Sequence, residues 1–251
     1  MEQITSRKNP LIAHIRKLIS DRAYRRQCGE FVGDGVKLLE EAVRWHAPLT
    51  CVVCTAEVCL PDLPDGVRVV EVPRDVMESI SPMKTPQGAL FLCRIPEVAA
   101  PEMLAGDHWL VLDGLQDPGN VGTIWRTADA LGADGLLLSE DCADPWNHKT
   151  VRATMGACFR LPVYQVERQA LPALLKRSDL PLYATALRDD TIDLRDANLT
   201  RAAVVIGSEG RGASEELLAA SDKTLKIPMR ERCESLNAAS AATIVLWEMA
   251  R

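Results

Sequence analysis

Several familiar signatures are missing from this sequence of 251 residues, and each absence argues against a class of protein. No window approaches about eighteen consecutive apolar residues, so we expect no membrane-spanning helix. The N-terminal stretch MEQITSRKNPLIAHIRKL is charged throughout and lacks the apolar core of a secretion signal. We therefore expect a cytoplasmic protein with no membrane partner.

A second ligand pair for a metal is also missing. Of the 8 cysteines, Cys51 and Cys54 form a C-x-x-C pair within LTCVVCTAEV, a stretch that predicts a β-strand. A structural zinc site needs four ligands, and the sequence has no second C-x-x-C to supply them. We therefore expect no metal, and we interpret the cysteines as small, reduced packing residues.

The usual nucleotide-phosphate motifs are absent as well. Neither G-x-G-x-x-G nor a P-loop ending in G-K-[ST] occurs, which argues against a Rossmann dehydrogenase. The stretch VVIGSEGRGASEELL, residues 204–218, instead has the spacing G-x-x-G-x-G, and its Glu209 would repel a phosphate. Its three glycines permit close backbone approach to a ligand, and Ser214 is a good N-cap for a following helix.

Positive charge is scarce overall but concentrated at one end. The formal net charge is -6, which excludes a generally basic nucleic-acid coat. Residues 1–26 nevertheless contain the cations Arg7, Lys8, Arg16, Lys17, Arg22, Arg25 and Arg26. Such a local patch can contact phosphates, and it can equally be an ordinary solvated helix surface.

The order of apolar runs predicts an α/β chain. In residues 1–95, helical patterns at 9–20, 35–46 and 74–81 alternate with the strand candidates LTCVVCT, GVRVVEVP and GALFLCRI. Residues 96–106, PEVAAPEMLAG, have the composition of a linker. In residues 107–251, helical segments alternate with the strand candidates HWLVLDGL, GLLLSE, LPVYQV, LPLYATAL, AAVVIGSEG and TLKIPM. This alternation predicts a parallel sheet covered on both faces, with ligands beyond the carboxyl ends of its strands.

Polar residues follow one of these strands in DGLQDPGNVG. We expect a turn at Asp117–Gly119 and a helix that starts at Val121 and ends before Gly132, which suits the C′ position. The apolar stripe of this helix is turned away from Arg126. On this stretch alone, Arg126 is best interpreted as a solvated arginine paired weakly with Asp129.

The last stretch, IPMRERCESLNAASAATIVLWEMAR, passes from a strand through a charged loop to an alanine-rich helix. Ser235 is the expected N-cap of that helix. The small residues 238–242 would let another backbone approach closely, either a loop or another subunit.

Taken together, the three loops resemble the three motifs of the SpoU/TrmH family of SPOUT RNA methyltransferases. The matching features are Asn120 with Arg126 six residues on, the G-x-E-x-x-G turn at 207–212, and the S-L-N run at 235–237. The first ninety-odd residues are similar to the family's RNA-substrate-binding domain through ITSRKNPLIAHIRKL, EFVGDGVKLLEEA and SPMKTPQGAL. The resemblance covers essentially the whole chain.

The resemblance implies a fold, a reaction and an assembly. It implies an L30e-like α/β RNA-binding domain at 1–95, a linker at 96–106, and a Rossmann-like SPOUT domain with a deep trefoil knot at 107–251. The family transfers a methyl group from S-adenosylmethionine to a ribose 2′-hydroxyl in RNA and works as homodimers. Relatives with the N-terminal domain act mostly on 23S ribosomal RNA, so we expect that substrate. The alternatives are tRNA and a non-catalytic RNA-binding protein.

The resemblance also implies residue roles. By motif position, the catalytic residues are Asn120, Arg126, Glu209, Ser235 and Asn237. The cofactor-binding residues are Thr185, Ala186, Leu187, Ile206, Gly207, Glu209, Ile227, Met229 and Leu236. The expected RNA-binding residues are Arg7, Lys8, Arg16, Arg25 and Arg26. Arginine is a poor base at neutral pH. We therefore favour binding of the adjacent phosphate and polarisation of the hydroxyl by Arg126 over proton abstraction.

Overall fold

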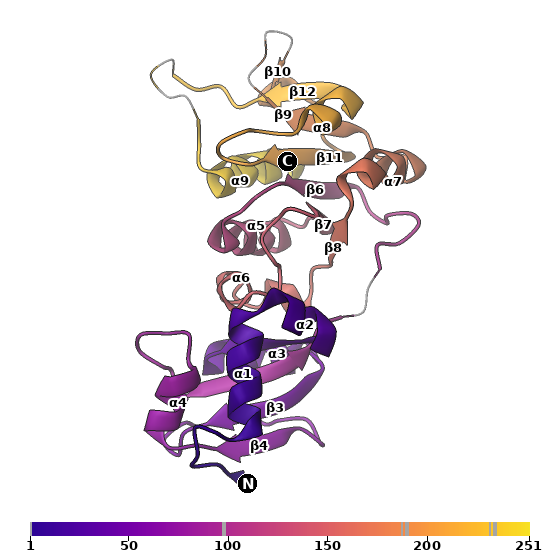
Figure 1. The fold of residues 1–251 in the computed structure, drawn as a ribbon. Coiled ribbons are helices and arrows are strands. Elements are labelled where there is room, and N and C mark those ends of the chain that lie inside the picture. Colours follow the sequence, from indigo (N-terminus) through magenta and orange to yellow (C-terminus); the bar gives the residue numbers. More distant parts are fainter. Residues whose placement is uncertain (1, 97–98, 187, 189–190, 231, 233–234) are drawn as a thin grey trace. The chain divides into compact units, whose positions relative to one another are not determined.

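The computed structural model describes residues 2–96, 99–186, 188, 191–230, 232 and 235–251 (Figure 1). The chain forms two compact units. Unit 1 comprises Met1–Glu97 and Trp146–Phe159, and unit 2 comprises Val98–Pro145 and Arg160–Arg251.

Unit 1 is built around a mixed sheet with the strand order β1-β4-β3-β5-β2, in which β1, β4 and β3 are parallel and β5 is antiparallel to both of its neighbours. Its elements are β1 (Glu2–Gln3), α1 (Pro10–Ser20), α2 (Arg22–Cys28), β2 (Glu30–Asp34), α3 (Val36–Arg44), β3 (Leu49–Cys54), β4 (Arg68–Glu71), α4 (Arg74–Ile80), β5 (Ala89–Arg94) and α6 (His148–Ala153). The predicted strands β3, β4 and β5 and the predicted helices α1, α3 and α4 are confirmed. The elements β1, α2 and β2 were not predicted.

The segment Trp146–Phe159 belongs to unit 1, although the sequence assigned it to the same predicted domain as the rest of 107–251. Aromatic packing accounts for the difference. The ring of Trp146 lies 4.9 Å from that of Phe31, and the ring of Phe159 lies 6.4 Å from those of both Phe31 and Phe91. These contacts bury apolar area that β2 and β5 would otherwise leave exposed.

Unit 2 is a seven-stranded, wholly parallel sheet with the order β10-β12-β9-β11-β6-β7-β8 (Figure 1). Its elements are β6 (His108–Asp113), α5 (Pro118–Ala130), β7 (Gly135–Ser139), β8 (Val163–Val166), α7 (Leu171–Arg177), β9 (Leu182–Thr185), β10 (Ile192–Asp193), β11 (Ala202–Gly207), α8 (Glu215–Ala220), β12 (Lys223–Lys226) and α9 (Ala238–Met249). The six predicted strands and their parallel arrangement are confirmed, and the two-residue strand β10 is an addition.

Part of the predicted linker is packed rather than free. Leu104 is buried in the core of unit 2, and its backbone N–H donates to Ser178 Oγ at 2.9 Å. Close by, the indole N–H of Trp109 donates to the carbonyl of Ala105 at 3.0 Å. Residues 104–105 are therefore part of unit 2.

The described cysteines are all free thiols. Five of them are buried, as expected of packing residues, whereas Cys28 and Cys59 are exposed. Burial raises the pKa of Cys51 to about 11 and that of Cys93 to about 12, so these thiols are inert. None of the helices in the described part of the chain is long and apolar enough to cross a membrane.

Candidate functional site

The candidate site lies at the carboxyl edge of the parallel sheet of unit 2, where β6, β9, β11 and β12 end. The first of its three loops leads from β6 into α5. The sequence predicted a turn before Val121, but α5 begins at Pro118, with Asp117 as its N-cap. The Asp117 carboxylate accepts a hydrogen bond from the backbone N–H of Asn120 at 2.9 Å. Asn120 therefore lies in the first turn of a helix, which fixes its direction.

The glycine-rich loop that follows β11 curls tightly upon itself. Ser208 and Gly212 exchange two backbone hydrogen bonds, of 3.1 and 2.8 Å. A Cβ atom at Gly207 would lie 2.0 Å from the backbone of Gly212 and of Ala213, so only glycine fits there. Ser214 caps α8 as predicted, accepting from the N–H of Leu217 at 3.4 Å.

The third loop enters α9, and here the predicted N-cap is wrong. Asn237, not Ser235, caps the helix, and its side-chain oxygen accepts from the N–H groups of Ala239 at 2.9 Å and Ser240 at 3.3 Å. Both residue types are good caps, but the exposed Ser235 lies two residues outside the cap, where it lines the cavity described below.

A chain of hydrogen bonds joins all three loops. Asn237 Nδ2 donates to Asn120 Oδ1 at 3.2 Å, and Asn120 Nδ2 donates to the Glu209 carboxylate. An ionised carboxylate only accepts, so the amide of Asn120 has one possible orientation. Three residues that the sequence placed in one site are thus brought together and held in a defined geometry.

Arg126 lies on the same helix as Asn120 and is exposed, whereas Val121, Ile124 and Trp125 are buried. The weak pair of Arg126 with Asp129, which this stretch suggested when taken alone and which the three loops together argued against, is not formed among the described residues. Asp129 instead accepts from Arg160 Nε at 2.7 Å. Among the described residues, the guanidinium of Arg126 has no hydrogen bond or ion pair, so its five donors face solvent.

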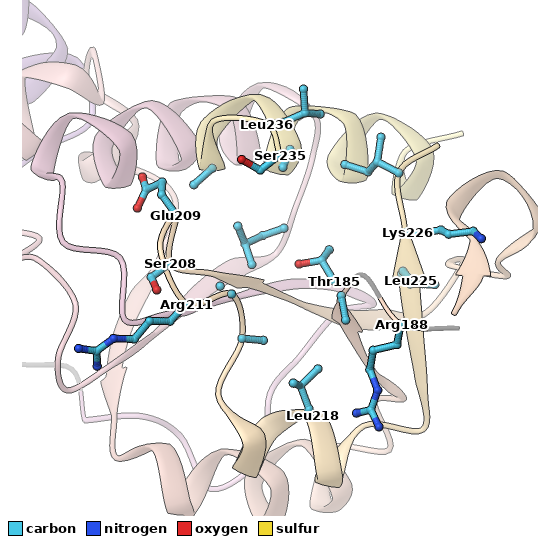
Figure 2. Close-up of a pocket in the computed structure, with 18 of the residues that line it drawn as sticks. Thr185, Arg188, Ser208, Glu209, Arg211, Leu218, Leu225, Lys226, Ser235 and Leu236 are labelled. Atoms are coloured by element: carbon cyan, nitrogen blue, oxygen red, sulfur yellow. The ribbon is translucent and has the colours of Figure 1, made fainter. Parts of the chain in front are cut away.

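A cavity of about 530 Å³ opens between the glycine-rich loop, α8 and the start of α9 (Figure 2). This volume lies within the usual range for small-molecule sites. The predicted cofactor-binding residues that line it are Thr185, Ala186, Ile206, Gly207, Glu209, Ile227, Met229 and Leu236. The remaining one, Leu187, lies outside the described residues.

The cavity also contains residues that the sequence analysis did not select. Figure 2 shows Leu218 of α8 on the side opposite Ser235 and Leu236, with Arg188 and Lys226 at one end and Glu209 toward the other. Helical periodicity did not single out Leu218, because consecutive residues of a helix project about 100° apart and the preceding residue, Leu217, packs in the core. Ala238 and Ala241 line the cavity as well, so the small-residue run serves in part to admit this loop cluster.

A largely buried ion pair ties the glycine-rich loop to β6. Asp113, which is 2% exposed, accepts from Arg168 Nε at 2.7 Å and from the backbone N–H of Ser214 at 2.7 Å. Arg168 also donates to both carboxylate oxygens of Asp141, at 2.7 and 2.6 Å, which raises the pKa of Arg168. The backbone of Asp113 pairs with that of Gly207 in the sheet, and its carboxylate binds Ser214 at the other end of the loop.

The predicted RNA-binding cations of unit 1 fall into two groups. Arg7 is ion-paired with Asp75 at 2.9 Å, and Arg16 donates to the backbone and hydroxyl oxygens of Ser79 at 3.1 and 2.8 Å. Arg25 is 3% exposed and donates to the carbonyl of Leu18 at 2.6 Å. The side chain of Arg25 therefore satisfies the end of α1 and cannot contact RNA, which corrects that prediction. Lys8 and Arg26 are exposed.

Comparison with known proteins places this architecture in a family. The model of the SpoU rRNA Methylase family matches residues 107–247, and that of the MRM3-like substrate binding domain matches residues 9–90. The chain belongs to the SpoU rRNA Methylase family. The α/β fold class and the N-terminal substrate-binding domain predicted for this SpoU-family chain are confirmed.

Two curated relatives are similar over nearly the whole SpoU-family chain. It is 31% identical to the 23S rRNA (guanosine(2553)-2′-O)-methyltransferase RlmP of Bacillus subtilis, with 99% of each chain covered. It is 30% identical to the 23S rRNA (uridine(2479)-2′-O)-methyltransferase of Streptomyces viridochromogenes, with 99% of this chain and 92% of the relative covered.

Solved structures agree with these similarities. The AdoMet-bound rRNA methyltransferase from Sinorhizobium meliloti superposes with a TM-score of 0.89 at 28% identity, covering 99% of this chain and 97% of the other. The SpoU methyltransferase AviRb from Streptomyces viridochromogenes, in complex with AdoMet, gives a TM-score of 0.84 at 27% identity, with 97% of each chain covered.

Proposed function

We propose that this chain transfers a methyl group from S-adenosylmethionine to a ribose 2′-hydroxyl of 23S ribosomal RNA. The observation that carries the proposal is the hydrogen-bonded chain Asn237–Asn120–Glu209 at the edge of a ligand-sized cavity. Two relatives named as 23S rRNA 2′-O-methyltransferases support the substrate, and two similar structures with bound AdoMet support the cofactor.

The residues of the cavity suit the cofactor. Ile206, Leu218 and Leu225 offer apolar walls for the faces of an adenine, and the backbone at Gly207 is open to close approach. When bound, S-adenosylmethionine supplies a methyl group on a sulfonium, which is already an excellent leaving group. The protein therefore has to bind, align and exclude water rather than provide a nucleophile.

The exposed arginine fits the RNA side of this reaction. Because Arg126 forms no internal hydrogen bond or ion pair in the described chain, its guanidinium is free to bind a phosphate bidentately and to polarise the neighbouring 2′-hydroxyl. Asn120 and Asn237 would orient Glu209, and Ser235 would line the cofactor side of the same site.

The same proposal includes an assembly, a knot and a location. We infer a homodimer formed through α9, because Trp247 and Ile244 on this helix are 63% and 37% exposed and form an apolar surface that a second copy would cover. By family resemblance we also propose that the knot lies around the cofactor loops. A ribosomal RNA substrate would place the reaction in the cytoplasm.

The test is tritiated methyl transfer from S-adenosylmethionine to ribosomal and transfer RNA isolated from a strain that lacks the protein. Nucleoside analysis should find one new 2′-O-methylated nucleoside in 23S rRNA. Incorporation into tRNA alone would refute the substrate, and cofactor binding without incorporation into either RNA would indicate an RNA-binding protein that does not catalyse methylation of these RNAs.

One variant distinguishes a role in RNA binding from a role in cofactor binding. Arg126→Ala should lower methyl transfer at least about 100-fold, because a charge-assisted bidentate contact to RNA is lost. Its affinity for S-adenosylmethionine, measured by calorimetry, should stay within about twofold of the wild-type value, since Arg126 does not line the cavity. A parallel collapse of cofactor binding would show that the assigned role is wrong.

A further inference from the structure

Several of the cations expected to bind RNA already have hydrogen-bond or ion-pair partners within unit 1. Other exposed cations of this unit come from α6 and from the stretch before β5. The segment Trp146–Phe159 brings α6 into unit 1, where Lys149 and Arg152 are exposed. The guanidinium of Arg152 contacts the sulfur of Met83, which lies beside the exposed Lys84. This contact joins residues that are 69 positions apart in the sequence and places Arg152 next to the stretch that contains Lys84.

These cations form no close ion pair within the part of the chain that the structure describes. Among the described residues, Lys84, Lys149 and Arg152 form no salt bridge, in contrast to Arg7, Arg68 and Arg74 of the same unit. A neighbouring carboxyl group, that of Asp34, is half-buried and hydrogen-bonded to Ser81 at 3.4 Å. Burial raises the pKa of Asp34, while its hydrogen bond from Ser81 and the charge of Arg152 act in the opposite direction. Asp34 is a nearby carboxyl group, but it forms no salt bridge with Arg152 among the described residues.

The half-buried His148, which begins α6, lies among several of these positive charges. Burial and the charge of Lys149 lower its pKa, a backbone hydrogen bond at Ile19 opposes this, and the charges of Arg25 and Arg152 lower the pKa further. His148 is therefore neutral at physiological pH, as expected of a half-buried group with several cations nearby. Such a region attracts polyanions over about one Debye length.

We propose that Lys84, Lys149 and Arg152, here called the α6 cationic surface, contact phosphates of the RNA substrate. The inference rests on the proposed function, because it assumes that RNA is the substrate. It adds to that function a contact made by a segment that lies within the catalytic part of the sequence but folds with the substrate-binding unit.

The size of the effect follows from counterion release. Each phosphate contact contributes about 0.7 to 0.9 to the slope of log affinity against log salt concentration, so the loss of two cations should reduce that slope by about 1.4 to 1.8. Over the decade between about 0.1 M and 1 M salt this corresponds to a loss of roughly 25- to 60-fold in RNA affinity at 0.1 M.

The experiment compares two double variants of the full chain, with in vitro transcribed 23S rRNA as the probe. Lys149→Gln/Arg152→Gln removes two charges from the α6 cationic surface. Arg44→Gln/Arg74→Gln removes two charges from the same unit, at exposed residues that form ordinary surface ion pairs. Affinity is measured by filter binding from 0.05 to 0.5 M KCl, with thermal unfolding and cofactor titration as checks of folding.

For Lys149→Gln/Arg152→Gln, the salt slope and the RNA affinity should both fall by the amounts given above. Arg44→Gln/Arg74→Gln should keep the wild-type salt slope. Both should keep the wild-type melting temperature and cofactor affinity. Equal slopes for the two variants, or a loss of affinity with the slope unchanged, would overturn the proposal while leaving methyl transfer by the wild type intact. If the wild type neither binds nor methylates 23S rRNA, the proposed function itself fails, and the inference fails with it.

Discussion

Replacement of Arg168 by alanine tests whether the ion pair beneath the glycine-rich loop builds the cofactor cavity. The change leaves the carboxylate of Asp113, 2% exposed, without its charged partner. Removing one partner of a fully buried pair costs about 3–5 kcal/mol. The side chain of Arg168 is 20% exposed, so water can partly replace it, and we expect a loss of about 2–4 kcal/mol in the free energy of unfolding.

A loosened loop should also bind the cofactor less well. The Asp113 carboxylate accepts from the backbone N–H of Ser214, so a carboxylate that has lost Arg168 loosens that end of the loop, while the backbone pairing at Gly207 stays. We expect the affinity for S-adenosylmethionine to fall about 10-fold, because ordering the loop must then be achieved on binding. Urea denaturation gives the stability, and isothermal titration calorimetry gives the affinity.

Two further variants make the test specific. Arg195→Ala breaks an ion pair with Asp193 in which the arginine side chain is 66% exposed, and it should leave the free energy of unfolding close to the wild-type value. Asp113→Asn/Arg168→Met removes both charges and should be less destabilised than Arg168→Ala, since no buried charge is left alone. The reasoning is refuted if Arg168→Ala is no less stable than Arg195→Ala, or if its cofactor affinity equals that of the wild type.

Three other predictions concern the site, the assembly and the pH dependence. Asn120→Asp places a second carboxylate against Glu209 and should reduce methyl transfer at least about 100-fold, whereas activity within threefold of wild type would contradict the orienting role of the amide. Trp247→Glu should convert a dimer of the 27.5 kDa chain into monomers in light scattering; a wild type that is already monomeric would disprove the proposed interface. Although partial burial opposes it, hydrogen bonds from Arg168 and Ser139 lower the pKa of Asp141 below 3.8. The ionised Asp141 therefore stabilises the folded chain above about pH 4, and this stabilisation is lost as the pH falls through the pKa of the folded state. In urea titrations at about pH 3 and pH 6, the free energy of unfolding of Arg168→Ala should therefore differ less between the two pH values than that of the wild type.

The sheet of unit 2 was predictable because its strands are short apolar runs that are buried on both faces. The element β2 escaped prediction because EFVGD contains only two large apolar residues, and the burial of Phe31 involves Trp146, more than a hundred residues away in sequence. Nothing in local periodicity reports such a contact. The same holds for Asp113 and Arg168, which are 55 residues apart.

The candidate site was predicted to a large extent, but through motif resemblance combined with the rule that ligands bind at the carboxyl edge of a parallel sheet. Local rules were less decisive inside the loops. Ser235 and Asn237 are equally good cap residues two positions apart, and only the position of the Asn120 amide explains why Asn237 is the cap. The predicted roles of Asn120, Arg126, Glu209, Ser235 and Asn237 stay predictions until activity is measured.

The placement of Trp146–Phe159 in unit 1 determines how the two units can be separated by proteolysis or by truncation. The chain passes between the two units at residues 97/98, 145/146 and 159/160, not once. A protease that cuts in the predicted linker would therefore produce two fragments that still behave as one particle on a sizing column, since the larger fragment carries aromatic rings that belong to the core of the smaller. An N-terminal fragment expressed alone would lack Trp146 and Phe159 over Phe31 and Phe91, and would present that bare apolar surface to the solvent. Expression of residues 1–95 alone would therefore yield an aggregation-prone fragment and not an independently folded substrate-binding domain.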